Sequence, residues 1–126
     1  MSASPAERPT VIVVDDDADL RRALRYSLEI EGFDVICCAN GERLLKLALP
    51  PATACLVVDQ LLPGISGIEA LERLRQRKVA IPAIVITSAA DARLRGRLLL
   101  ADAQLIEKPL LNDHLTDTIR DLIQPA

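Results

Sequence analysis

Five short apolar runs, each followed by a segment whose apolar residues have helical spacing, constrain this chain more than any other feature. The first run, TVIVV at residues 10–14, is continuous and β-branched, which is typical of a strand buried on both faces. The other four predicted strands are FDVICC (33–38), ACLVVD (54–59), AIPAIVIT (80–87) and AQLIE (103–107). Such strands need a layer of packing on each side of their sheet, and the segments between them must supply it.

Those segments have the pattern of amphipathic helices. In residues 18–31, Leu20, Leu24 and Leu28 recur one helical turn apart, and Gly32 suits a helix C-terminus. The remaining predicted helices are 41–49, stopped by Pro50 and Pro51, then 66–77, 90–102 and 112–123. The 90–102 segment has the poorest helix propensity, because Gly96 costs about 1 kcal/mol relative to alanine. Five strand–helix pairs with right-handed crossovers predict an α/β fold, a parallel sheet with helices on both faces.

Length, charge and hydropathy exclude several classes of protein. At 126 residues the chain is long enough for one domain with its own core; we predict a flexible leader at 1–9, the domain over 10–124 and no output domain after it. A net charge of −3 and a pI near 5.1 argue against a sizeable nucleic-acid-binding surface. No apolar run approaches the roughly 18 residues of a membrane span, and the leader lacks the apolar centre of a secretory signal. We therefore expect a cytoplasmic protein without direct nucleic-acid or membrane contact.

The residue types also limit the core. Only Tyr26 and Phe33 are aromatic, so the core must consist mainly of leucine, valine, isoleucine and alanine. Cys37, Cys38 and Cys55 are odd in number and lack CxxC spacing, which argues against a disulfide framework or a zinc site. We expect these cysteines to be small buried apolar residues in a reducing compartment.

Polar residues follow four of the five predicted strands. Asp15 and Asp16 come after the first strand, Asp59 ends the third, Thr87 ends the fourth and Lys108 follows the fifth. In open parallel sheets, ligands bind at the carboxyl ends of the strands. These five side chains are therefore predicted to converge in one crevice.

The residue types indicate the chemistry of that crevice. Converging carboxylates repel one another, and a hard divalent cation such as Mg²⁺ relieves the repulsion. A bound cation and a lysine ammonium can together neutralise a phosphoryl group in transfer, and a carboxylate can be the attacking nucleophile. The sequence thus predicts Mg²⁺-assisted phosphoryl transfer onto an aspartate.

On these residues the chain resembles the response-regulator receiver domains of two-component signalling, over roughly residues 9 to 124. The matching stretches, in order, are VIVVDDDADLRRAL, CLVVDQLLPGISGIEAL, IPAIVITS and LIEKPL. The resemblance implies a (βα)5 flavodoxin-like three-layer sandwich with strand order 2-1-3-4-5. It also implies that the Lys108–Pro109 peptide bond is cis.

The resemblance assigns a role to each site residue. Asp59 would be the phosphoacceptor, and Asp16 and Asp59 would bind Mg²⁺ directly, with Asp15 acting largely through water. The backbone carbonyl of Leu61 would be the third protein ligand of the metal. Lys108 would pair with the phosphoryl group and the acceptor carboxylate, and Thr87 would swing toward the phosphate. Asp17 and Asp19, by contrast, are interpreted as a helix N-cap and a first-turn acid.

The function implied is that of a phosphorylatable switch and not of an enzyme acting on a separate substrate. A sensor histidine kinase would phosphorylate Asp59, and the output would be protein–protein contact or onward transfer to a histidine phosphotransferase. The resemblance leaves open whether the protein also forms a homodimer. Two alternatives remain: a receiver-like interaction module that works without phosphorylation, and a haloacid-dehalogenase-like phosphatase that uses Asp15 and Asp17 as its motif.

Several positions depart from the family pattern. Leu105 stands where receivers usually carry an aromatic residue, Leu110 replaces a phenylalanine, and the segment between Thr87 and Lys108 is one residue shorter than in most relatives. Leu61 and Ala89 are apolar where the family tunes access of water to the phosphorus, which predicts slow self-dephosphorylation.

The remaining charged residues have plainer interpretations. His114 is expected to be a solvated residue early in the last helix. The arginine runs Arg21, Arg22, Arg25 and Arg93, Arg95, Arg97 are interpreted as solvated faces that could contact a partner.

Overall fold

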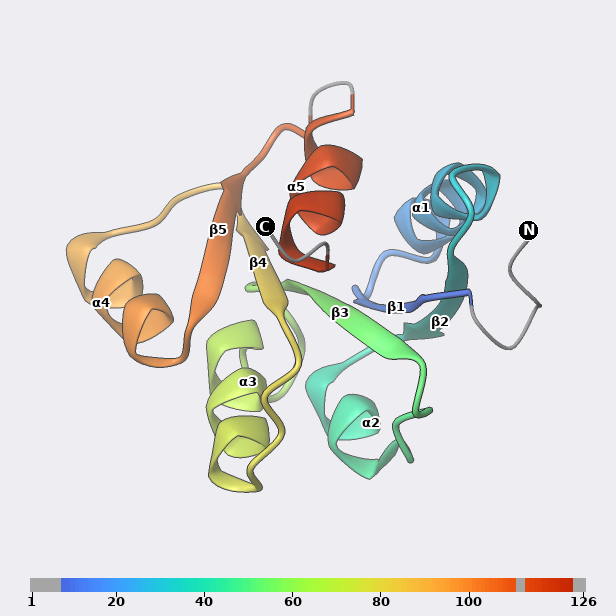
Figure 1. Ribbon diagram of the computed structural model, residues 1–126. Helices are drawn as coiled ribbons and strands as arrows, with labels where there is room; N and C mark the ends of the chain where they lie inside the picture. The colour runs from blue at the N-terminus through green and yellow to red at the C-terminus, as the bar shows by residue number, and fades with distance from the viewer. Residues whose placement is uncertain (1–7, 111–112, 124–126) are drawn as a thin grey trace.

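The computed structural model describes residues 8–110 and 113–123 and contains a five-stranded parallel sheet in the order β2-β1-β3-β4-β5. Strands and helices alternate along the chain (Figure 1). The strands are β1 (Thr10–Val14), β2 (Asp34–Cys38), β3 (Thr53–Asp59), β4 (Ala83–Thr87) and β5 (Ala103–Glu107). The helices are α1 (Ala18–Ile30), α2 (Gly41–Lys46), α3 (Gly67–Gln76), α4 (Ala92–Leu100) and α5 (His114–Ile123). This topology confirms the predicted α/β fold and strand order.

The sheet separates two hydrophobic cores (Figure 1). Helices α1 and α5 cover one face, where Leu28, Phe33 and Ile119 are almost fully buried. Helices α2, α3 and α4 cover the other, where Leu44 and Leu71 are buried. Residues 11–14 of β1 alternate between the two cores, and the whole strand, Thr10 included, is buried, as its sequence predicts.

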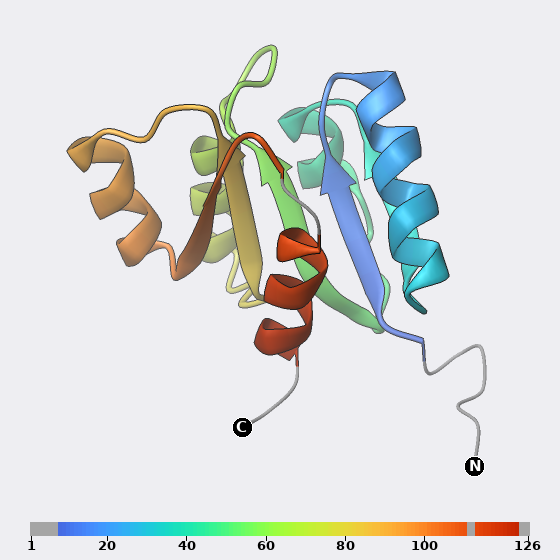
Figure 2. The ribbon, with the colours of Figure 1, turned by 90° about the horizontal axis from the view of Figure 1, so that it is seen from above.

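The carboxyl ends of β1, β3 and β4 lie at one edge of the sheet (Figure 2).

The predicted ends of these three strands, residues 14, 59 and 87, agree with the structure, whereas several other predicted boundaries differ from it by a few residues. Helix α2 ends at Lys46 because Leu47 is already extended, three residues before Pro50. Strand β4 begins at Ala83, after Pro82, rather than at residue 80. The start of the last predicted helix, residue 112, and most of the predicted leader lie outside the described residues.

Specific caps define the helices that follow the functional edge. The Asp17 carboxylate accepts hydrogen bonds from the N–H groups of Asp19 and Leu20 at the start of α1. This confirms its interpretation as an N-cap. Helix α3 begins with a reciprocal capping box between Ser66 and Glu69.

The three cysteines are free thiols, with Cys38 and Cys55 buried and Cys37 half-buried. Burial raises the pKa of the Cys55 thiol to about 12, which keeps it protonated and unreactive.

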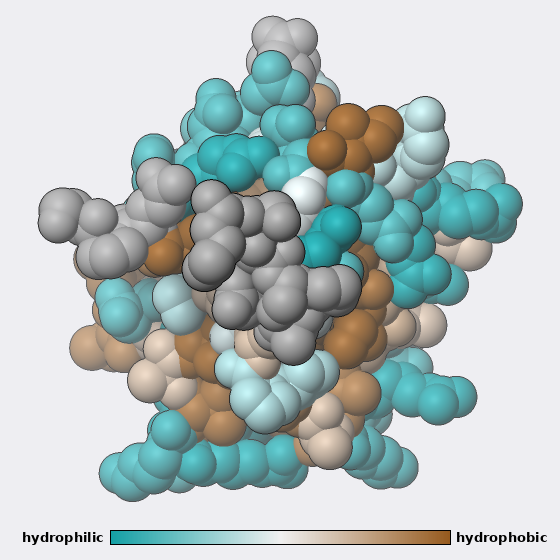
Figure 3. Space-filling model, turned by 45° about the vertical axis from the view of Figure 1, so that its right-hand side comes forward, coloured by the Kyte–Doolittle hydropathy of each residue, from teal (hydrophilic) through white to brown (hydrophobic). Residues whose placement is uncertain are grey.

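Both polar and apolar side chains reach the surface. In the view of Figure 3, hydrophilic side chains surround the rim, with apolar groups between them. Large apolar side chains that are nonetheless exposed are Tyr26, Ile30, Leu61, Leu99 and Leu100. In the described part of the chain, none of the helices has the length and apolar character needed to cross a membrane.

Candidate functional site

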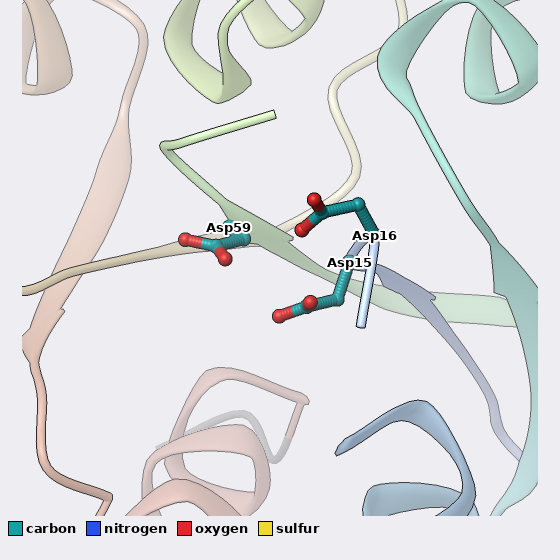
Figure 4. A group of neighbouring side chains, drawn as sticks. All are labelled: Asp15, Asp16 and Asp59. Atoms are coloured by element: carbon teal, nitrogen blue, oxygen red, sulfur yellow. The ribbon is translucent and has the colours of Figure 1, made fainter. Parts of the chain in front are cut away.

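Three carboxylates gather at the carboxyl edge of the sheet. Asp15 and Asp16 follow β1, Asp59 ends β3, and one oxygen from each lies within 4.8 Å of the others. Figure 4 shows the three groups turned to the same side of the strand ends. Asp15 and Asp59 are buried and Asp16 is exposed, so the cluster opens to solvent on one side.

The burial of Asp15 has an electrostatic consequence. Burial raises the pKa of the Asp15 carboxyl; the hydrogen bond from the Asp17 N–H, at 2.8 Å, opposes this, and the nearby charge of Asp59 adds to it. The backbone at this point is fixed by Arg21, whose guanidinium donates to the Asp15 carbonyl at 2.6 Å. Asp15 is therefore held in place in a setting that disfavours its negative charge.

Asp59 is bonded on both of its carboxylate oxygens. The Lys108 ammonium lies 3.2 Å from Oδ2, and the Leu61 N–H donates to Oδ1 at 3.3 Å. Lys108 reaches this position because it directly follows β5 and its N–H donates to the Thr87 carbonyl. The peptide bond between Lys108 and Pro109 is cis, as the family resemblance implies.

The loop after Asp59 is folded tightly against the backbone of that residue. The Gln60 carbonyl and side-chain amide oxygen accept from the N–H groups of Gly67 and Ile68. A Cβ at Gly67 would lie only 2.4 Å from the Asp59 carbonyl oxygen, so this contact requires glycine. The start of α3 thus abuts the backbone of Asp59.

Thr87 ends β4, the strand next to β3, but its hydroxyl does not bond to Asp59. Its side chain is buried, and its hydroxyl donates to the Ala89 carbonyl at 3.0 Å and accepts from the Ala89 N–H at 3.3 Å. Donation to a phosphoryl group on Asp59 would require this hydroxyl to give up the Ala89 carbonyl.

Two adjoining hollows share Asp59, Leu61 and Lys108. One, of about 460 Å³, contains the acidic cluster. The other, of about 510 Å³, runs toward α4 and is lined by Thr87 and Ala89, and also by Arg93 and Arg97. Sequence analysis interpreted these arginines as part of a solvated face that could contact a partner, and did not place them at the site. Their separation by four positions, which puts them on one side of a helix, is the signal that could have placed them together.

The donor set suits a hard divalent cation. Three carboxylates that approach this closely, with the pKa of Asp15 raised by burial, could hold a divalent metal ion that neutralises their charge, and they offer the oxygen ligands that such ions prefer. The Leu61 residue lines the same hollow, where its carbonyl is the predicted further ligand. All five predicted side chains, those of Asp15, Asp16, Asp59, Thr87 and Lys108, line one or both hollows.

Fold and site together define a flavodoxin-like α/β domain with an acidic, lysine-bearing pocket at the carboxyl edge of its sheet. Residues 11–120 match the family model described as the response regulator receiver domain. The chain belongs to this family, whose members are signalling switches of two-component systems.

Curated relatives agree with the family match. The chain is 33% identical over 118 residues to the transcriptional regulatory protein FixJ of Bradyrhizobium diazoefficiens, an alignment that covers 92% of this chain and 57% of FixJ. It is 32% identical over 110 residues to nodulation protein W of the same organism, covering 86% of this chain and 48% of that protein. The chain spans about half the length of these relatives.

Solved structures show the same fold. The response regulator StyR superposes with a TM-score of 0.84 at 36% identity, covering 92% of this chain and 59% of StyR. A CheY-like receiver domain protein from Methanospirillum hungatei gives 0.82 at 26% identity, covering 90% and 92%. Response regulator TrrA from Thermotoga maritima, in complex with Mg²⁺-BeF, gives 0.79 at 28% identity, covering 90% and 98%.

Proposed function

We propose that this receiver domain is a phosphorylatable switch that accepts a phosphoryl group on Asp59 from the phosphohistidine of a sensor histidine kinase. The observation that carries the proposal is the position of Asp59: a buried carboxylate paired with Lys108 at 3.2 Å and flanked by Asp15 and Asp16. A buried acid needs compensation for its charge, and this arrangement provides it on one side while leaving the pocket open on the other.

Asp15, Asp16, Asp59 and the Leu61 carbonyl would hold Mg²⁺. The bound cation would neutralise charge on the phosphoryl oxygens during transfer. The Mg²⁺-BeF complex of TrrA, a relative in fold and family, supports this choice of metal.

The residues of this chain divide the remaining work. An Asp59 carboxylate oxygen attacks phosphorus, the O–P bond forms, and the N–P bond of the phosphohistidine breaks. Lys108, already beside Oδ2, keeps its ammonium near the phosphoryl oxygens and balances part of the charge that arrives. Thr87 exchanges its bond to the Ala89 carbonyl for one to a phosphoryl oxygen. The direction of the Thr87 hydroxyl thus reports the state of Asp59.

The output is a changed protein-binding surface or onward transfer to a histidine phosphotransferase, and a homodimer is one form that the surface contact could take. The leader at 1–9 and the domain at 10–124 would act in the cytoplasm, without direct contact to nucleic acid or membrane.

The phosphorylated form is expected to be long-lived. Attack of water on the phosphorus needs a polar group that orients the water. The two positions where the family tunes this access of water carry apolar residues here, the exposed Leu61 and Ala89. The measurement is the loss of phosphoryl mass after the donor is removed. A half-life of seconds in the isolated domain would contradict the expectation.

The function is tested by incubating the protein with Mg²⁺ and acetyl phosphate and measuring the intact mass. Wild type should gain one phosphoryl group, whereas Asp59→Asn should gain none. Labelling that persists in Asp59→Asn and disappears in Asp15→Asn would instead favour the phosphatase alternative. No labelling of folded wild-type protein would favour an interaction module that works without phosphorylation.

A further inference from the structure

Arg93 is a cation at the acceptor pocket that the proposed transfer does not use. It lies in the first turn of α4 and lines the same hollow as Asp59, Thr87 and Lys108. Its side chain is exposed. Within residues 8–110 and 113–123, it forms neither an ion pair nor a side-chain hydrogen bond.

The neighbouring cations all have partners. Lys108 pairs with Asp59, and Arg95 pairs with Glu107 at 2.9 Å on the β5 side of α4. Arg97 also lines the hollow, but its guanidinium is held by both carboxylate oxygens of Glu72 on α3. Arg93 is therefore the pocket cation whose charge is not already matched in the described structure.

Phosphorylation would create an unmatched negative charge next to it. The Asp59 carboxylate and the Lys108 ammonium balance each other, whereas the acyl phosphate that replaces this carboxylate carries about −1.5 to −2 of charge near neutral pH, a net gain of about 0.5 to 1 negative charge. Asp91 is a further negative residue that lines the same hollow. Its carboxylate accepts a hydrogen bond from the Leu94 N–H at 2.8 Å, which holds it at the start of α4. An arginine fork matches the geometry of phosphate oxygens better than a point charge does.

We propose that Arg93 binds the phosphoryl group on Asp59 from the α4 side and thereby couples phosphorylation to the position of that helix. This inference rests on the proposed function. Helix α4 is suited to the role because it buries only Leu98 among its own residues, so a new charge-assisted bond at its first turn meets little resistance. Such coupling would not need an aromatic side chain on β5, where this chain has Leu105.

The test compares phosphorylation of Asp59 by acetyl phosphate with Mg²⁺ in wild type, Arg93→Gln, Arg93→Lys and Arg95→Gln. Intact mass gives the rate of labelling, and thermal unfolding checks that each variant is folded. Arg93→Gln should slow labelling about tenfold, the size expected for losing one charge-assisted hydrogen bond. Arg93→Lys should recover part of the rate, and Arg95→Gln, the matched change on the other side of α4, should leave it within about twofold of wild type.

Equal rates for Arg93→Gln and Arg95→Gln, with wild type labelled on Asp59, would overturn the role of Arg93 and leave the proposed function intact. Absence of labelling in folded wild-type protein would overturn the proposed function itself. A second readout is hydrogen exchange of α4, which should decrease on phosphorylation in wild type and not in Arg93→Gln. A decrease of the same size in both would also overturn the coupling.

Discussion

Helices α3 and α4 cover the same face of the sheet and both adjoin the site, α3 through the backbone of Asp59 and α4 through side chains that line the hollow, but they are held very differently. Helix α3 buries five of its residues, has a capping box, and places Gly67 against the backbone of Asp59. Helix α4 buries only Leu98, contains Gly96, and leaves Leu99 and Leu100 exposed. The support behind the Asp59 backbone, which we call the α3 wall, is thus packed into the core, whereas the α4 wall, whose Arg93 and Arg97 line the hollow, rests on the edge of the core.

This difference assigns separate tasks to the two walls. The α3 wall fixes the backbone of Asp59, and the nucleophilic role proposed for Asp59 requires such fixed geometry. The α4 wall carries Arg93 and Arg97 and has few buried apolar contacts, which is the condition under which a segment responds to a local change in charge. A phosphoryl group on Asp59 should therefore move α4 and leave α3 in place.

The largest predicted effect comes from Gly67→Ala. The new Cβ would meet the Asp59 carbonyl oxygen at 2.4 Å and the Gln60 Cα at 3.0 Å, so backbone must move. We expect a loss of about 3 kcal/mol in the free energy of unfolding, measured by urea denaturation, and a large decrease in Asp59 labelling. A Gly67→Ala protein as stable as wild type would remove the argument for a rigid α3 wall.

Asp15→Asn tests the cluster of carboxylates formed by Asp15, Asp16 and Asp59 at the ends of β1 and β3. Burial is the main cause that raises the pKa of Asp15, and the nearby charge of Asp59 adds to it. The folded state therefore binds a proton at Asp15 more tightly than the unfolded state does. The stability of the metal-free protein should therefore fall as pH rises through the interval between the ordinary and the raised pKa. Removing the charge with Asn should abolish this dependence and stabilise the metal-free protein above that interval by about 1 kcal/mol.

The same variant should respond less to Mg²⁺. A ligand that binds only the folded state at ten times its Kd adds about 1.4 kcal/mol of stability, which raises the melting temperature. Wild type should show this shift at millimolar Mg²⁺, and Asp15→Asn should show a smaller one. Equal shifts in the two proteins would place the cation away from Asp15.

Gly96→Ala is the counterpart of the change at Gly67, with the opposite sign. A Cβ at Gly96 would have no heavy atom within 4 Å, and alanine favours the helix. We expect the free energy of unfolding to increase by about 0.5–1 kcal/mol, measured by the same denaturation as for Gly67→Ala. If the two substitutions changed stability alike, the contrast between the two helices would be wrong.

The smallest predicted effect comes from the link between the two helices. Glu72→Gln weakens the pairing of Arg97 with α3, where both side chains are more than a third exposed. The cost to global stability should be about 0.5 kcal/mol. Hydrogen exchange should rise in α4 and stay unchanged in α3, and a rise confined to α3 would contradict the proposed looseness of α4.

Much of this arrangement could be predicted from the sequence because strands buried on both faces have an unambiguous pattern. TVIVV and ACLVVD identify β1 and β3, and parallel pairing then brings Asp15, Asp16 and Asp59 to one edge. The cap formed by Asp17 also follows from local chemistry. These features depend on residues near in sequence or on a general rule of sheet topology.

Other features depend on contacts between distant segments, which periodicity does not encode. Arg97 on α4 forms an ion pair with Glu72 on α3. Gly67 contacts the Asp59 carbonyl because the loop after β3 folds back on the end of that strand. The placement of Arg93 in the pocket likewise depends on how α4 packs beside β5. The early end of α2 and the late start of β4 have a different cause, the local backbone around Leu47 and Pro82.

The most direct test of the two-wall account is hydrogen exchange of the full chain before and after phosphorylation of Asp59 by acetyl phosphate with Mg²⁺. The account predicts that protection changes in α4 and in the segment between Thr87 and α4, while α3 is unchanged. Equal changes in α3 and α4, or no change in α4 when Asp59 is fully phosphorylated, would contradict it.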